Sequence, residues 1–326
     1  MVATKTKVDV TDAKPEALAA LREDVRRGLT SRPRFLPPKY FYDRKGTRLF
    51  EAITHLPEYY LARAEMAILR ERADEIVAEA GPTDLIELGP GASGKTRLIL
   101  DAMERAGTLE AFLPLDISSD ALERMVLDLS RDYKSLRIQG LVGDFARTLD
   151  RIPPGGRRLV AFMGSTLGNL DRQDAVSLMR RISRLLKAND LFLLGTDLVK
   201  PTAVLEAAYN DAAGITARFN RNILTVINRK LGAAFRPGLF DHHAFFNADM
   251  SRIEMHLRAR RAHTVRIADL EMSVDFEAGE LLHTENSYKY TREIITSMLR
   301  EAGLKLRRWL VDEGNVFALS LSGKAS

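Results

Sequence analysis

The segment DLIELGPGASGKT, residues 84–96, joins a short apolar run to a glycine-rich loop and the start of a helical pattern. From this segment to residue 197, similar apolar runs alternate with amphipathic helical segments. This alternation is typical of a parallel β-sheet whose strands are joined by helical crossovers. We therefore predict an α/β fold, in which ligands bind at the carboxyl ends of the strands.

The regions on either side of this sheet have different patterns. Upstream, helices are predicted near residues 14–28, 45–54 and 61–80, separated by the loops RPRFLPPKYFYD and LPEYY. Downstream, a long helical stretch from Pro201 to about residue 232 precedes alternating segments with a central NADM turn, which predict antiparallel strands. The C-terminal tail has a helix–strand–turn–strand pattern, so its two strands are expected to return to the edge of the first sheet.

The composition is that of a soluble globular protein, and the length favours two structural units or one large domain with an insertion. The chain has 326 residues, of which 45% are hydrophobic and 29% charged, and its net charge is +5. This small surplus falls far short of a nucleic-acid-binding surface. The absence of cysteine excludes disulfides, thiol nucleophiles and thiolate metal sites, and it fits a cytoplasmic location. Apolar runs such as LVAFM are too short to span a bilayer, so neither nucleic acid nor a membrane is expected as a partner.

The glycine loop fits two classes of nucleotide-binding site. Residues 89–96, GPGASGKT, match the phosphate-loop pattern G-x-x-x-x-G-K-[ST] and follow a predicted strand, as in an NTPase. The overlapping residues 87–91, ELGPG, match the E-x-G-x-G loop of S-adenosylmethionine (SAM) methyltransferases, in which glycines let the cofactor approach the backbone. The loop alone leaves both enzyme classes open.

The ends of the next strands favour SAM. Asp116 ends the second apolar strand, where a carboxylate can accept two hydrogen bonds from a ribose diol. Asp144 and Phe145 follow the third strand and offer an acceptor for the adenine amino group and a stacking face. An NTPase would need a magnesium-supporting Asp, for which Asp116 and Asp197 are the candidates. Each Asp alone is more simply a helix cap or turn former, but three signals in the right order favour the methyltransferase.

Beyond these residues the chain resembles a known family, the histidine Nα-methyltransferases of ergothioneine biosynthesis. The resemblance covers nearly the whole chain and rests on the segments PPKYFYDRKGTRLFEAITHLPEYYLARAE, LIELGPGASGKTRLIL, FMGSTLGNL, LLGTDLVKP, AYNDAAGITARFNRNIL, RIEMHLRAR and TENSYKY, in the family's order and spacing. The glycine loop departs from the family's usual ELGSGTSEKT at Pro90 and Gly94. These departures leave the expected cofactor role intact and create the phosphate-loop pattern.

The resemblance implies conversion of L-histidine to its trimethylated betaine, hercynine, with SAM as the methyl donor and no metal. It implies a Rossmann-like class I methyltransferase domain over residues 62–200 and 288–326, and a discontinuous α+β substrate-binding domain over residues 1–61 and 201–287. It assigns SAM binding to a set of strand-end residues: Gly89, Lys95, Asp116, Asp144 and Phe145. Histidine is expected between the domains, with Tyr42 and Asn169 as catalytic residues and Asn169 also among the substrate-binding residues, which are Tyr59, Gly164, Tyr209, Met255, Glu285 and Ser287.

The chemistry agrees with this assignment. Methyl transfer from a sulfonium to nitrogen is an in-line displacement that depends mainly on positioning, so it needs neither a metal nor a covalent intermediate. His242, His243 and His256 lie on predicted strands without carboxylates at ligand spacing, so we expect them to be structural or surface residues and assign no metal. We expect a monomer. Three alternatives stay open: a relative that methylates another amino acid or amine, a catalytically silent SAM-binding protein, and an NTPase that uses residues 89–96.

Overall fold

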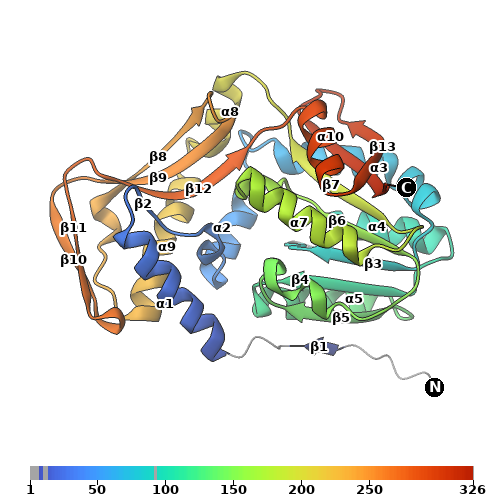
Figure 1. Cartoon of the computed structure of the whole chain (residues 1–326), viewed down its shortest axis with the longest axis horizontal. Helices are drawn as coiled ribbons and strands as arrows, with labels where there is room; N and C mark the ends of the chain where they lie inside the picture. Colours follow the sequence, from blue (N-terminus) through green and yellow to red (C-terminus); the bar gives the residue numbers. More distant parts are fainter. Residues whose placement is uncertain (1–6, 10–13, 92–93, 326) are drawn as a thin grey trace. The chain divides into compact units, whose positions relative to one another are not determined.

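The computed structural model describes residues 7–9, 14–91 and 94–325, so Ala92 and Ser93 of the glycine loop lie outside the described residues. The chain forms two compact units (Figure 1). Unit 1 comprises Met1–Thr11, Leu61–Val199 and Tyr288–Ser326, and unit 2 comprises Asp12–Tyr60 and Lys200–Ser287. Within the described part of the chain, no helix is long and apolar enough to cross a membrane.

Unit 1 contains an eight-stranded sheet in the order β1-β5-β4-β3-β6-β7-β14-β13. Its strands are β1 (Lys7–Asp9), β3 (Asp84–Leu88), β4 (Ala111–Asp116), β5 (Arg137–Val142), β6 (Arg158–Phe162), β7 (Leu191–Asp197), β13 (Leu304–Val311) and β14 (Phe317–Lys324). The neighbours from β1 to β7 are parallel, whereas β14 is antiparallel to both β7 and β13. Along the chain, the strand order reverses direction at β3. The switch point therefore lies between β3 and β6, where doubly wound sheets bind their ligands.

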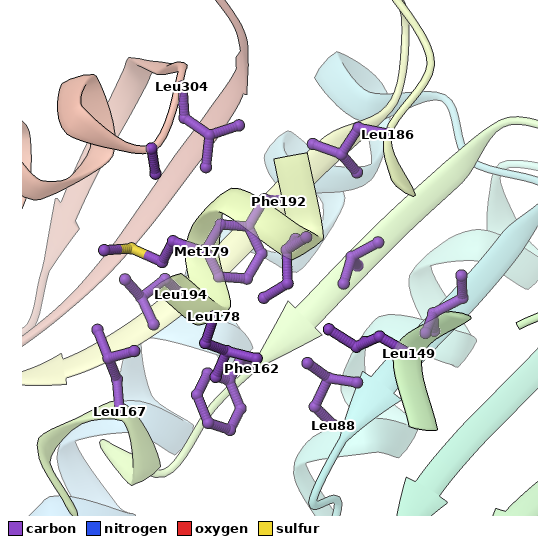
Figure 2. Close-up of a cluster of buried hydrophobic side chains, with 14 of the residues drawn as sticks. Leu88, Leu149, Phe162, Leu167, Leu178, Met179, Leu186, Phe192, Leu194 and Leu304 are labelled. Atoms are coloured by element: carbon purple, nitrogen blue, oxygen red, sulfur yellow. The ribbon is translucent and has the colours of Figure 1, made fainter. Parts of the chain in front are cut away.

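Helices cover both faces of this sheet, because right-handed crossovers on the two sides of the switch point lie on opposite faces. On one face, α4 (Gly94–Arg105) packs against α3 (Leu61–Ala80), which also contacts β14. On the other face, α7 (Arg172–Leu185) and α10 (Arg292–Glu301) cover a cluster of buried apolar side chains. Figure 2 shows part of this core, including the sheet residues Phe162, Phe192 and Leu194 and the α7 residues Leu178 and Met179.

Unit 2 contains a four-stranded sheet in the order β2-β12-β9-β8 and a separate antiparallel hairpin, β10–β11. The strands are β2 (Arg34–Phe35), β8 (Phe240–Asn247), β9 (Arg252–Ala259), β10 (His263–Ile267), β11 (Met272–Phe276) and β12 (Leu281–Tyr288). Helix α9 (Ile215–Leu231) packs against α2 (Arg44–Thr54), β8 and β9, and α8 (Thr202–Tyr209) also contacts β8 and β9. Helix α1 (Lys14–Thr30) contacts β2.

The predicted elements are present, including the C-terminal pair β13–β14 at the sheet edge, with two differences. The long helix expected after Pro201 is split into α8 and α9. A turn separates them because Gly214 adopts a φ of 66° and the Asp211 carboxylate accepts the N–H groups of Ile215 and Thr216. The second difference is the presence of two short strands that were not predicted. β1 pairs with β5, and β2 lies in the predicted loop RPRFLPPKYFYD and pairs with β12. Both are too short to show a periodic pattern in the sequence.

Candidate functional site

The glycine loop follows β3 at the switch point of the sheet. Gly89 and Gly91 have φ values of 62° and 59°, in the left-handed region that favours glycine. A Cβ at either position would meet no described atom within 4 Å. The two glycines therefore serve the backbone conformation and leave space beside the loop, where backbone N–H groups can bind an anionic or polar ligand.

Asp116 ends β4, the strand next to β3. Its carboxylate accepts hydrogen bonds from the backbone N–H of Ser118 at 2.8 Å and from the backbone N–H of Gly91. Burial raises the pKa of Asp116 above its usual value, and these hydrogen bonds oppose the rise. The carboxylate is thus fixed against the glycine loop, where it can accept further hydrogen bonds from a diol.

Asp144 and Phe145 follow β5, the other neighbour of β4. Phe145 begins the short helix α6 (Phe145–Thr148) and packs edge to face on Phe162, the last residue of β6, with ring centroids 5.2 Å apart. Both Asp144 and Phe145 are half-buried. The predicted cofactor residues after β3, β4 and β5 therefore lie at the same end of the sheet.

Lys95, in the first turn of α4, is paired with a residue that the sequence analysis missed. Its Nζ donates to Oε2 of Glu65 in α3 at 2.6 Å, and the backbone N–H of Gly164 donates to the same carboxylate at 2.8 and 3.0 Å. Glu65 is fully buried, and a Cβ at Gly195 would lie 2.2 Å from its Oε1. The glycines in MGS and GTD are the available signal in the sequence, because glycine in or after a strand often marks a close approach.

Asn169 and Gly164 lie on the segment that follows β6. Gly164 has a φ of 74°, and Asn169 ends the short 3₁₀ helix η3 (Thr166–Asn169). Near this segment, Asp197 at the end of β7 forms an ion pair with Lys289 at 2.8 Å, and both side chains are fully buried. Lys289 thus neutralises one of the two aspartates that could support magnesium, which argues against the NTPase.

A chain of contacts within unit 2 links the predicted catalytic residue Tyr42 with three predicted substrate-binding residues, Tyr59, Tyr209 and Ser287. The ring of Tyr42 lies 5.6 Å from that of Phe50, Phe50 lies 6.2 Å from Tyr59, and Tyr59 lies 6.3 Å from Tyr209. All three pairs are edge to face, the arrangement that aromatic quadrupoles favour. Tyr209 Oη then donates to Ser287 Oγ at 2.7 Å. The two tyrosine-containing loops are thereby linked to α8 and β12.

Met255 and Glu285 lie on the neighbouring strands β9 and β12. Thr284 Oγ1 donates to the backbone carbonyl of Met255 at 3.0 Å, so the two predicted residues are close in the strand pairing. Met255 and Glu285 are only 1% and 7% exposed. Burial alternates along β12 except at Thr284 and Glu285, which are both buried, so the alternation breaks where Glu285 begins the predicted imidazole-binding pair.

The arrangement in unit 1 defines a class of protein. A doubly wound parallel sheet, a glycine loop at its switch point and a carboxylate after the neighbouring strand are the features of an α/β enzyme that binds a nucleoside-containing cofactor. More narrowly, the chain belongs to the SAM-dependent, histidine-specific methyltransferases, whose family model matches residues 21–324. The sheet of unit 1 is therefore that of a class I SAM-dependent methyltransferase, as predicted.

Individual relatives agree with the family. The chain is 48% identical to a histidine N-alpha-methyltransferase of Mycolicibacterium smegmatis, over 95% of this chain and 97% of the relative. It is 45% identical to a protein of the same name from Mycobacterium tuberculosis, over 94% and 95% of the two chains. An ergothioneine biosynthesis protein 1 of Schizosaccharomyces pombe is 31% identical over 83% of this chain and 36% of that protein. The family predicted from the sequence is confirmed.

Proposed function

We propose that the chain transfers three methyl groups from SAM to the α-amine of L-histidine and so forms hercynine for ergothioneine biosynthesis. The observation that carries this proposal is the nearly full-length match to two proteins named histidine N-alpha-methyltransferase. In this proposal unit 1 binds SAM and unit 2 binds histidine. The family membership and the strand-end residues of unit 1 support the first assignment, and the buried polar residues of β12 support the second.

The cofactor roles follow from the chemistry of each side chain. SAM supplies a methyl group that its sulfonium makes electrophilic. Asp116 accepts two hydrogen bonds from the ribose diol, Asp144 accepts one from the adenine amino group, and Phe145 stacks on the adenine ring. Lys95 contributes a cation that Glu65 holds in place beside the glycine loop. The open space beside Gly89 and Gly91 supports this assignment.

The imidazole roles fall on β9 and β12. Glu285 accepts a hydrogen bond from one ring N–H, and Ser287 bonds to the other ring nitrogen. Met255 packs against the ring. Tyr209 already donates to Ser287 Oγ, and this bond orients the hydroxyl toward a proton-donor role. Tyr59, which packs on Tyr209, closes the same side of the amino acid.

The amine roles fall on Tyr42 and Asn169. An α-ammonium group must lose a proton before its nitrogen can attack, and each of these two side chains offers a polar group that can hydrogen-bond to the amine. Water accepts the proton, so the reaction needs no metal. Gly164 lies on the same segment as Asn169, and a Cβ at this position would lie 3.3 Å from Lys95 Nζ, so only glycine leaves the segment this close to Lys95.

Competition among histidine, tryptophan and phenylalanine tests the proposal, with release of the demethylated cofactor as the readout. An indole or phenyl ring cannot reproduce both imidazole hydrogen bonds, the one to Glu285 and the one to Ser287, and the lost bond costs about 1–3 kcal/mol. Histidine is therefore expected to exceed both competitors at least about tenfold in kcat/KM. Glu285→Ala is expected to remove most of this preference by losing histidine turnover. Glu277→Ala, which changes an exposed carboxylate near the same strand, is the matched control.

The other outcomes of this experiment assign the alternatives. Equal wild-type rates for histidine and tryptophan would indicate a methyltransferase for another amine. Tight SAM binding without turnover of any amino acid would indicate a catalytically silent protein. Magnesium-dependent ATP hydrolysis that Lys95→Ala abolishes, together with no calorimetric signal for SAM, would indicate the NTPase.

A further inference from the structure

Strands β9 and β12 carry a cluster of two histidines and a carboxylate that the methyl-transfer site does not use. Glu254 and His256 lie two residues apart on β9, and His283 lies on β12, its neighbour in the sheet (Figure 1). One carboxylate oxygen of Glu254 and one ring nitrogen of each histidine all lie within 4.8 Å of one another. Shifts of less than about 1 Å would place three such atoms about 2.1 Å from a common ion.

Glu254 is oriented as metal-binding carboxylates are. Its Oε1 accepts hydrogen bonds from Nε and Nη2 of Arg252 at 2.9 and 2.7 Å and from Nδ2 of Asn247 at 2.9 Å. Its other oxygen, Oε2, lies 3.6 Å from Nε2 of His256. Hydrogen bonds to one oxygen thus fix the carboxylate while the second oxygen faces the histidine, an outer-shell arrangement that is common around metal ligands. The positive charge of Arg252 opposes cation binding, and its Nε and Nη2 both donate to Oε1.

His256 is held in place but not satisfied. It is only 7% exposed, and its Nδ1 has no hydrogen-bond partner among the residues that the structure describes. A buried nitrogen without a hydrogen bond lowers the stability of the fold by about 1–3 kcal/mol. Rotation of the ring about its Cβ–Cγ bond exchanges the positions of the two sides of the imidazole. Phe245 of β8 stacks on the ring at 5.6 Å with an interplanar angle of 9°. His256 is therefore buried against Phe245 with Nε2 facing Glu254, and its Nδ1 has no hydrogen-bond partner among the described residues.

His283 completes the set from β12. Its ring centroid lies 5.0 Å from that of His256. Its Nε2 lies 2.8 Å from Asn286 Oδ1, and in the tautomer that donates to this oxygen the proton is on Nε2 and Nδ1 carries a lone pair. A metal-binding histidine usually donates its other ring N–H in this way.

We propose that Glu254, His256 and His283 bind one divalent transition-metal ion of the Zn²⁺ class, at a site separate from methyl transfer. Two histidines and one glutamate form a known three-ligand zinc set, which leaves a fourth position for water. Only the pairing of β9 with β12 brings these residues together. In this proposal His256 is a metal ligand and no longer one of the histidines expected to be structural or surface residues. Because the ligands come from two strands, the ion cross-links the strands that carry Met255 and Glu285.

Titration of the full chain without an affinity tag tests this site, because a histidine tag would itself bind the ion. Calorimetry is expected to show one equivalent of Zn²⁺, and Co²⁺ is expected to give the visible absorption of a four-coordinate site. Zn²⁺ should also raise Tm, since it binds only the folded chain at this site. His256→Gln and His283→Gln are each expected to weaken Zn²⁺ binding at least about tenfold. His55→Gln, which changes an exposed histidine outside the cluster, should leave it unchanged.

Glu254→Gln guards against misfolding, because it keeps the shape of the side chain and removes the negative charge. It is expected to bind SAM as the wild type does and to lose Zn²⁺ affinity. No saturable Zn²⁺ binding by the wild type, or equal binding by the wild type and all three cluster variants, overturns the proposal. Methyl transfer is expected to survive treatment with EDTA, and its loss would contradict the separation of this site from the reaction.

Discussion

Asp116 is the single residue on which the cofactor assignment depends most. Asp116→Ala is expected to weaken binding of SAM and of its demethylated product by about 1.5–3 kcal/mol, the scale of hydrogen bonds to a charged group. Calorimetry measures this loss. Asp128→Ala, which removes an exposed carboxylate on the adjacent helix α5 (Ser119–Asp132), should leave the affinity unchanged. Equal affinities for the wild type and Asp116→Ala would remove the ribose role from this residue.

Glu87, the last but one residue of β3, makes the stability of the chain depend on pH. Burial raises its pKa to about 7, although Thr96 donates to Oε2 at 2.7 Å, and Oε1 has no hydrogen-bond partner among the described residues. The unfolded chain ionises this group near its ordinary pKa of 4.5. Glu87 therefore contributes stability below that value, and the contribution is lost as the pH rises to about 7.

Glu87→Gln is expected to remove this dependence, because glutamine stays neutral and can still accept from Thr96. Relative to the variant, the wild type should lose about 3 kcal/mol of unfolding free energy between about pH 4.5 and pH 7.5. Urea denaturation at several pH values measures the difference. Parallel pH profiles for the two proteins would show that Glu87 is ionised in the folded state throughout.

The residues at the strand ends could be predicted because each follows a recognisable apolar run. Glu65 could not be predicted in this way. It is a charged residue inside a helical pattern, where acidic residues usually face solvent, and its partners Lys95 and Gly164 come from other elements. The cluster of Glu254, His256 and His283 could not be predicted for a similar reason, because only strand pairing places these residues together.

Among the contacts between elements, those of Glu65 in α3 involve three neighbours. Lys95 of α4 and the backbone N–H of Gly164 after β6 donate to its carboxylate, and Gly195 of β7 lies close to its Oε1. Glu65→Gln is expected to lower the free energy of unfolding by about 2 kcal/mol or more, because Lys95 loses its charge partner and the glutamine amide group directs a donor at another donor. Urea denaturation measures the loss. Glu71→Gln, at an exposed position on the same helix, is the control and should be neutral. Equal stability of the two variants would mean that the ion pair contributes no net stability.

Most elements could be predicted, because the apolar runs of β3, β6 and β7 are buried along their whole length and the helices show clear amphipathic periods. The break between α8 and α9 depends on side-chain capping by Asp211, which a periodicity argument does not detect. The break in the alternating burial of β12 at Glu285 also depends on tertiary packing. Such local departures lie close to residues that we assign to the site.

At the scale of the whole molecule, the two units divide the proposed work. Unit 1 has the sheet, the glycine loop and the Asp116 carboxylate to which we assign SAM, and unit 2 carries the buried Glu285 and the Tyr209–Ser287 hydrogen bond. The resemblance identified the family from sequence segments spread over both units. The glycine loop by itself could not have identified the family, because it also fits an NTPase.

Mass spectrometry of L-histidine incubated with SAM and the purified chain is the most direct test of histidine Nα-trimethylation. We expect a product heavier than histidine by three methylene units, and fragmentation should place all the methyl groups on the α-nitrogen. Asp116→Ala should form the same product more slowly at limiting SAM. No mass gain, a product that stops at one methyl group, or methyl groups on the imidazole ring would contradict trimethylation of the α-amine.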